Sequence, residues 1–192
     1  MTIAAYIVVA LALSITDMIL TRRCAEPFPI RLSTGMVMAF AISMIQTILY
    51  VTGMAIGDLL RLESTTDANI FSRPNAYIAL GLFIIVILKL ILPYLRREPK
   101  LQVFNLTNPM AVVAMAVATG INMLLTGLAM GFCSPLSGHF HLAVWPLLVM
   151  AFLFSYLGIM FGRQKVNMRP RRWIIVASVL LLGTAIAAVV NS

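Results

Sequence analysis

Long apolar segments alternate with short polar stretches along the whole chain. Each segment is long enough to cross the ~30 Å hydrocarbon core of a bilayer as a helix, which takes about 20 residues. Backbone groups in lipid must be hydrogen-bonded within their own segment, so we expect helices and not strands. The pattern predicts an all-α membrane protein with six transmembrane helices, over residues 2–21, 34–57, 75–95, 108–130, 142–162 and 173–190.

The composition agrees with this class. Hydrophobic residues make up 61% of the chain, only 10% of residues are charged, and the mean hydropathy is +1.01. The first apolar segment has no basic region before it and no small-residue cleavage site, so we do not expect a signal peptide. The net charge of +8 would suggest nucleic acid in a soluble protein. Here the basic residues sit at the ends of apolar segments, which favours lipid headgroups as their partners and not nucleic acid.

The distribution of basic residues predicts the orientation. Loops rich in Lys and Arg stay on the cytoplasmic side of a membrane. Eleven of the fourteen Lys and Arg residues fall in the first, third and fifth loops, namely Arg22, Arg23, Arg31, Arg96, Arg97, Lys100, Arg163, Lys165, Arg169, Arg171 and Arg172. The second loop holds only Arg61 and Arg73, and the fourth holds none. Both termini are therefore expected outside.

A pattern of polar residues, with a methionine and two glycines, appears twice along the chain, 105 positions apart. The pairs are Ser14 with Thr119, Asp17 with Asn122, Met18 with Met123, Thr21 with Thr126, Gly53 with Gly158, and Gly57 with Gly162. This duplication divides the single membrane domain, 1–192, into repeats at 1–100 and 101–192. Three helices per repeat is an odd number, so the halves would have opposite topology. The prediction is a 3+3 inverted repeat whose pseudo-two-fold axis brings Asp17 towards Asn122, as in many secondary transporters.

Asp17 is the only carboxylate within the predicted spans. Ionisable residues in a membrane are costly and usually mark a site or a pathway. On the first predicted helix, Ser14 and Thr21 share one face with Asp17. The fourth predicted helix repeats this face with Thr119, Asn122 and Thr126. The second predicted helix has a further polar face formed by Ser43, Gln46, Thr47 and Tyr50. Oxygen ligands without thiolates suit hard or borderline divalent cations such as Mn²⁺, Mg²⁺ or Ca²⁺. For the hydroxyl and amide groups, hydrogen bonding between helices is the alternative.

Lys89 is the only basic residue well inside a predicted span. Lys89 and Asp17 lie at a similar distance from the outer ends of their helices. Three interpretations remain open: a structural ion pair with Asp17, a side chain that extends to the cytoplasmic surface, or a counter-charge that Asp17 releases when a cation arrives.

Other candidate chemistry is weak. His139 and His141 lack a third metal ligand, and Cys24 and Cys133 are expected on opposite sides of the membrane, which excludes a disulfide. The chain has no phosphate-binding loop, zinc-protease motif, nucleophile–base pair or dinucleotide fingerprint. We expect neither enzymatic activity nor a bound cofactor. The glycines include small-x-x-x-small pairs, which permit close helix crossings.

Several short stretches together resemble the bacterial manganese efflux pump family, within the lysine-exporter superfamily. The stretch from Ala12 to Asp17 is similar to the S-x-x-D signature of the family's first helix. The stretches from Gln46 to Gly57, Thr119 to Met123, and Leu157 to Gly162 resemble its second-, fourth- and fifth-helix motifs. The resemblance implies a multi-pass protein of the bacterial inner membrane. It also implies a cation site at Asp17, Gln46 and Asn122, and a basic residue at the position of Lys89.

The chain departs from this family at two of the three acidic positions. The resemblance implies acids where this chain has the amides Gln46 and Asn122. An amide keeps an oxygen ligand but loses a negative charge. The expected function is a secondary transporter that exports manganese or a related divalent cation through Asp17, Asn122, Gln46, Ser14 and Thr119. The alternatives are an exporter of small organic solutes such as amino acids, or a membrane partner protein that transports nothing. Homo-oligomerisation is left open.

Overall fold

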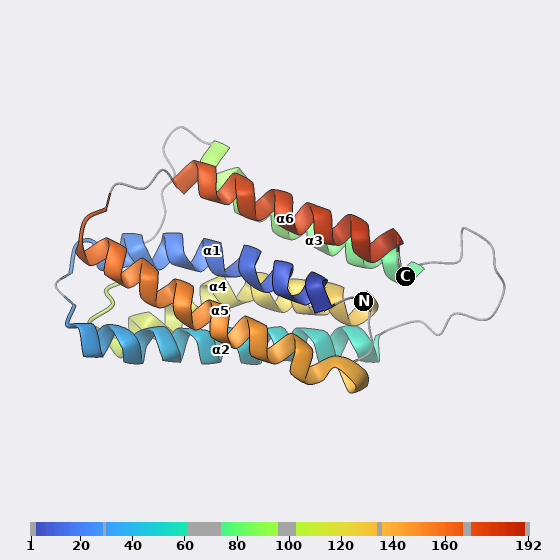
Figure 1. Cartoon of the computed structure of the whole chain (residues 1–192), viewed down its shortest axis with the longest axis horizontal. Coiled ribbons are helices and arrows are strands. Elements are labelled where there is room, and N and C mark those ends of the chain that lie inside the picture. Colours follow the sequence, from blue (N-terminus) through green and yellow to red (C-terminus); the bar gives the residue numbers. More distant parts are fainter. Residues whose placement is uncertain are drawn as a thin grey trace.

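The computed structural model describes residues 3–28, 30–60, 74–95, 103–133, 136–166 and 170–190. All of the secondary structure in these ranges is α-helical, and the helices run in alternating directions (Figure 1). Each of the six is long and apolar enough to cross a membrane. The predicted all-α class is confirmed. The helices are α1 (Ile3–Ala25), α2 (Leu32–Leu59), α3 (Pro74–Leu95), α4 (Pro109–Cys133), α5 (Leu136–Arg163) and α6 (Pro170–Val190).

The helix α5 differs most from its predicted span. It begins at Leu136, six residues before the predicted start, and continues through Pro146. A proline interrupts one hydrogen bond of a helix without ending it when packing holds both sides. The helix α4 begins directly at Pro109, where a missing N–H leaves no bond unmade.

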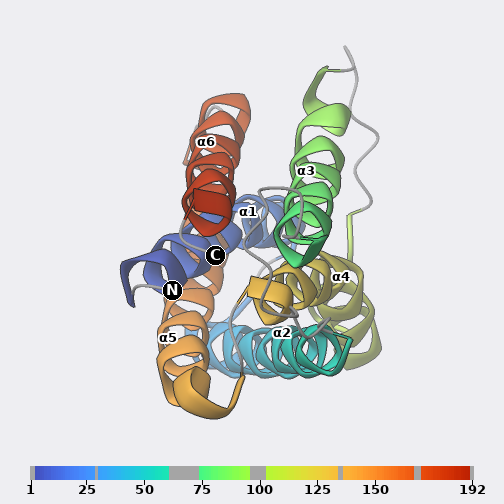
Figure 2. The ribbon, with the colours of Figure 1, turned by 90° about the vertical axis from the view of Figure 1, so that its right-hand side faces the viewer.

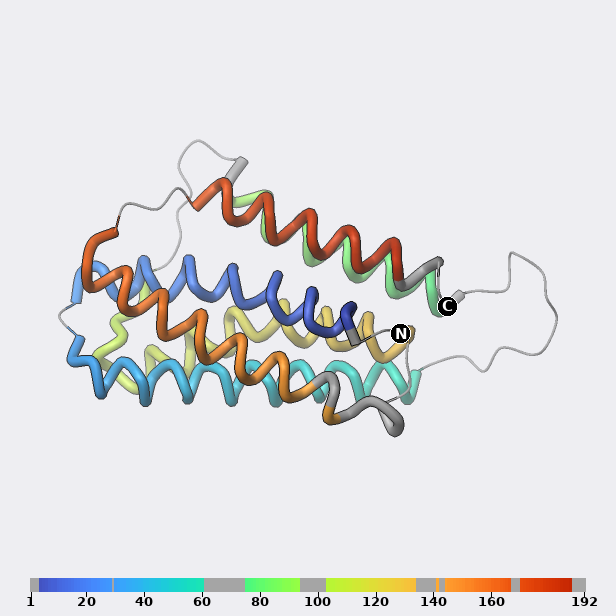
Figure 3. The backbone as a smooth tube through the Cα atoms, viewed as in Figure 1, coloured from blue at the N-terminus to red at the C-terminus, as the bar shows by residue number. Residues whose placement is uncertain are grey.

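Four helices form a central block and two lie outside it. The helix α1 packs chiefly against α5, and α2 packs against α4 and α5. The outer helices α3 and α6 contact each other, with α3 resting on α4 and α6 on α1 (Figure 2). The start of α1 and the end of α6 lie at the same end of the bundle (Figure 3).

Glycines make the two main crossings close. A Cβ on Gly53 would overlap the Leu124 carbonyl oxygen, and one on Gly127 would overlap the Tyr50 carbonyl oxygen, so α2 and α4 touch backbone to backbone. In the same way Gly158 lies against Met18 where α5 crosses α1. Without a hydrophobic drive between helices in lipid, such contacts hold helices together. The predicted small-residue packing is confirmed at these crossings.

Apolar side chains fill the bundle and also cover its outside. Tyr50, Phe83 and Met123 are among the large buried side chains, whereas Val37 and Leu88 are among the exposed ones. Apolar outer faces are expected where the solvent is lipid. Five of the methionines in the described residues are core residues. The buried ones are Met18, Met54, Met115, Met123 and Met130.

Basic residues gather at one end of the bundle, where α1 and α5 end and α2 and α6 begin (Figure 1). They are Arg22, Arg23, Arg31, Arg163, Lys165, Arg171 and Arg172. This is the end that the positive-inside rule assigns to the cytoplasm. Of the other cations used for the orientation, Arg61, Arg73, Arg96, Arg97, Lys100 and Arg169 lie outside the described residues.

Candidate functional site

The site is built around Asp17 in the middle of α1. The side chain is only 2% exposed, because α1 is enclosed by α5, α6 and part of α4. Its Oδ1 accepts a hydrogen bond of 2.9 Å from Nε2 of Gln46, a fully buried residue on α2. The same nitrogen donates to Oγ1 of Thr119 on α4 at 2.8 Å. One amide group therefore links three helices, of which α1 and α2 lie in the first predicted repeat and α4 lies in the second.

Several buried oxygen atoms of this cluster have no hydrogen-bond partner within the described residues. They are Asp17 Oδ2, Gln46 Oε1, Asn122 Oδ1 and Ser14 Oγ. Ser14 lies one turn before Asp17, and Asn122 lies one turn after Thr119, so the four belong to adjacent turns of the linked helices. A polar atom buried without a partner is unfavourable, and a cation would satisfy several at once. The donor set, carboxylate plus neutral oxygens, suits a hard or borderline divalent ion.

The structure brings most of the predicted site together, with one difference in geometry. Asp17 connects to the second repeat through Gln46 and Thr119 and makes no hydrogen bond with Asn122 among the described contacts. The α1–α4 contact is slight, because α5 and α2 occupy the larger faces of these helices. The amide of Gln46 spans this separation.

Most of the other hydroxyls are satisfied inside their own helices. Each donates to a carbonyl one turn earlier, which leaves little for bonds between helices. The donors and acceptors are Thr21 with Asp17, Ser43 with Phe40, Thr47 with Ser43, and Thr126 with Asn122. Within the described part of the chain, Thr119 is the hydroxyl group that takes part in a hydrogen bond between helices, as the acceptor from Gln46. The four hydroxyl groups named above bond within their own helices and do not join one helix to another.

Lys89 does not join the cluster. It is exposed on α3, and no ion pair links it to Asp17 in the described residues. Their helices are not among the main packing partners, since α3 rests on α4 and α6. The structural ion pair that the sequence left open is therefore not formed. The described ion pair lies at the basic end, between Arg22 and Glu26 at 3.8 Å.

The weaker candidates stay apart from the cluster. His141 is exposed near the start of α5, and the side chain of His139 lies outside the described part. Cys24 and Cys133 lie at opposite ends of the bundle, so no disulfide joins them, as predicted. Among the described residues, no three His, Cys, Asp or Glu side chains come together.

Ser155 is the residue that sequence reasoning missed. It lies on α5, is fully buried, and its Oγ has no partner within the described chain. Gly158 on the same helix contacts Met18 and Thr21, so Ser155, one turn earlier on a helix parallel to α1, lies near the level of Asp17. The signal was available, because the 105-residue shift that relates the repeats pairs Ser155 with Tyr50 of the polar stripe on α2.

Six helices of membrane length around a buried carboxylate, amide and hydroxyl cluster fit a multi-pass membrane transporter. The chain belongs to the manganese efflux pump family. The family model described as "Putative manganese efflux pump" matches residues 29–189. The matched part begins after α1, so Ser14 and Asp17 lie outside it. No curated protein and no solved structure matches the chain.

Proposed function

We propose that this protein is a secondary transporter that exports Mn²⁺ or a related divalent cation across the bacterial inner membrane. The observation that carries the proposal is the Asp17–Gln46–Thr119 cluster, which is buried, spans three helices and retains unpaired acceptor oxygens. Membership of the manganese efflux pump family supports the identity of the ion.

In this mechanism Asp17 is the charged ligand of the transported ion. Gln46 Nε2 holds one carboxylate oxygen by a bond of 2.9 Å, which orients the other, Oδ2, for the cation. Gln46 Oε1, Asn122 Oδ1 and Ser14 Oγ supply neutral oxygens, and Thr119 fixes the amide of Gln46 from α4. Lys89 is left out of the ligand set because it is exposed on α3.

The inverted repeat, with halves at 1–100 and 101–192, is part of the proposal. The packing pattern is unchanged when the halves are exchanged: α1–α5 then corresponds to α2–α4, and α1–α6 corresponds to α3–α4. The helices α1 and α4 also run in opposite directions (Figure 1). Rocking of one half against the other would open the cluster to each side in turn. With the basic end in the cytoplasm, both termini lie outside.

Export of a small organic solute such as an amino acid is the second candidate. It is favoured by the single carboxylate of the cluster, since Gln46 and Asn122 contribute no charge. A solute with its own ammonium group would need one acid, whereas a divalent ion gains from several.

Cellular manganese content tests the proposal directly. A manganese-export-deficient bacterium would carry empty vector, the wild-type protein, Asp17→Asn or Thr52→Val, with membrane levels matched by immunoblot. Thr52 is an exposed residue of α2 and serves as the control. We expect lower manganese with wild type and Thr52→Val but not with Asp17→Asn. Equal export by a correctly folded Asp17→Asn protein would refute the mechanism.

A further variant tests whether the missing acids, and not the fold, prevent manganese export. Asn122→Asp combined with Gln46→Glu supplies the two charges that the family resemblance implies. If wild type leaves manganese unchanged and this double variant lowers it, the chain retains an exporter scaffold for another substrate, and counterflow of labelled amino acids becomes the next measurement. If neither lowers it and no solute exchanges, the chain is a membrane partner protein that does not transport.

A further inference from the structure

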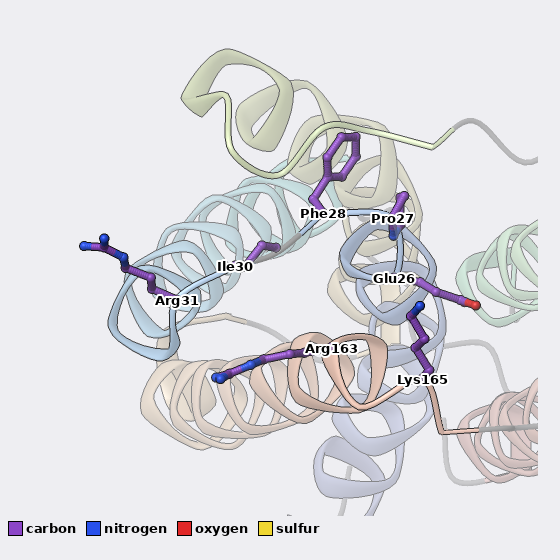
Figure 4. A pocket seen from close by; sticks show the side chains of 7 residues that line it. All are labelled: Glu26, Pro27, Phe28, Ile30, Arg31, Arg163 and Lys165. Atoms are coloured by element: carbon purple, nitrogen blue, oxygen red, sulfur yellow. The ribbon is translucent and has the colours of Figure 1, made fainter.

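A cavity of about 570 Å³ opens at the basic end of the bundle, away from the Asp17 cluster. It lies between the segment that follows α1 and the end of α5 (Figure 4). Its lining combines apolar and charged side chains from two segments, the connection between α1 and α2 and the end of α5: Glu26, Pro27, Phe28, Ile30, Arg31, Arg163 and Lys165.

The charge of this cavity is predominantly positive. Arg31, Arg163 and Lys165 line it, against a single carboxylate, Glu26. That carboxylate is already within 3.8 Å of the guanidinium of Arg22, which does not line the cavity. None of the three lining cations forms an ion pair with an acid in the described residues. In Figure 4, Arg31 and Arg163 come from facing walls and extend to the same side. The cavity therefore presents positive charge without a matching negative charge.

Lys165 has a backbone conformation that is unusual for its residue type. Its φ is 52°, which is in the left-handed region. No other non-glycine residue in the described part of the chain has a positive φ. Its N–H donates to the Gly162 carbonyl at 3.1 Å and the N–H of Val166 donates to the Phe161 carbonyl at 3.1 Å, which closes α5. Glycine is the usual residue at this closing position, because a side chain is unfavourable there. Such outliers cluster at ligand sites, and here the outlier lines the cavity, where its side chain lies beside Glu26 (Figure 4).

The position of the cavity indicates the source of an anionic ligand. It lies where helices of membrane length end, which is the depth of lipid headgroups. Basic pockets between transmembrane helices at the cytoplasmic side are suited to anionic headgroups. The apolar walls formed by Pro27, Phe28 and Ile30 match the glycerol and first methylene groups of a lipid. A divalent cation, by contrast, would be repelled here.

We propose that this cavity binds the headgroup phosphate of an anionic phospholipid from the cytoplasmic leaflet. Arg31, Arg163 and Lys165 supply the positive charge that attracts the phosphate, and Phe28 and Ile30 contact the apolar part of the lipid. The inference does not depend on which substrate the transporter carries. It assigns a lipid site to the junction of α1, α2 and α5, the contact that would move if the two halves rock.

Native mass spectrometry of the purified protein tests this assignment. The protein in detergent is titrated with phosphatidylglycerol, with phosphatidylcholine and with inorganic phosphate. Arg163→Gln with Lys165→Gln removes two cations from the cavity. Arg171→Gln with Arg172→Gln is the matched control, because it removes two exposed cations at the same end of the bundle on α6. Two basic residues beside an anionic lipid are together worth about thirtyfold in affinity. We expect about that loss for the cavity pair and near wild-type binding for the control.

A third variant guards against a failure of folding. Lys165→Gly removes the charge but suits the left-handed backbone better than lysine does, so it should unfold at the same or a higher temperature while binding less phosphatidylglycerol. Equal losses in both pairs, or equal binding of phosphatidylcholine, would overturn the assignment. Binding of inorganic phosphate that needs Arg163 and Lys165, with no preference for the lipid, would overturn the lipid source and identify a free anion instead.

Discussion

The bond between Gln46 and Asp17 leads to the sharpest prediction about the site. Replacing Gln46 by Met keeps an unbranched side chain of similar volume in a fully buried position, so the packing changes little. It removes the one nitrogen that donates to both Asp17 and Thr119. The two hydrogen bonds are lost with little change of shape.

The two bonds differ in expected strength. The bond to Thr119 joins neutral groups, and neutral bonds in membrane bundles average about 0.6 kcal/mol. Thr119 also keeps its own bond to the Met115 carbonyl at 3.0 Å. A bond to a charged group contributes about 1.5–3 kcal/mol. Asp17 would be left with both carboxylate oxygens unpaired, because Oδ2 already lacks a partner among the described residues. We therefore expect the free energy of unfolding to fall by about 2–3.5 kcal/mol.

Double-mutant cycles separate the two bonds. Unfolding in mixed micelles of sodium dodecyl sulfate and dodecyl maltoside, followed by circular dichroism, would be measured for Gln46→Met with Asp17→Leu and with Thr119→Val. The expected coupling energy is about 1.5–3 kcal/mol for the first pair and about 0.6 kcal/mol for the second. Thr52→Val on the exposed face of α2 should change stability by less than about 0.5 kcal/mol. A Gln46–Asp17 coupling no larger than the Gln46–Thr119 coupling would refute the claim that Gln46 holds a charged ligand.

Three further predictions concern packing, orientation and the residue that sequence reasoning missed. Gly53→Ala should lower the thermal unfolding temperature, because the added Cβ meets the backbone of α4 and overpacking costs about 1–3 kcal/mol. Gly183→Ala is the control and should leave the unfolding temperature unchanged, because Gly183 lies in open space. Equal effects of the two substitutions would contradict the close crossing of α2 and α4. In a cysteine-free background, Gln164→Cys should react with an impermeant thiol reagent only from the cytoplasmic side and Leu60→Cys only from outside; the reverse pattern would invert the proposed topology. Ser155→Ala should leave stability nearly unchanged yet reduce manganese export, and unchanged export would exclude Ser155 from the ion's path.

The number and class of the elements were predictable because they depend on local properties. Whether a segment of about 20 apolar residues spans a bilayer is decided by its own length and hydropathy, which need no knowledge of its neighbours. The six helices of the structure follow the predicted segments, and α5 begins six residues before its predicted start. The basic end of the bundle was predictable for the same reason, since each cation stays next to its own segment.

The candidate residues could also be named from the sequence, but their partners could not. Asp17, Gln46 and Thr119 stand out because each is a polar group in an apolar segment. Which of them meet depends on how each helix is rotated about its axis and on which helices cross. The glycines of α4 and α5 decide those crossings through backbone contacts. The sequence predicted that Asp17 and Asn122 face each other across the repeat, but it did not predict that the amide of Gln46 bridges α1 and α4.

The sequence by itself thus determined the membrane class, the six helices, the basic end and the polar residues of the candidate site, since these follow from hydropathy and charge read along one chain. Only the tertiary structure decided that Gln46 joins Asp17 to Thr119, that Lys89 faces outwards and that Ser155 is buried beside α1. It alone also formed the cavity lined by Arg31, Arg163 and Lys165. The reason is physical: the environment of a side chain in a bundle is set by the other helices, and those contacts join residues that are far apart in the sequence.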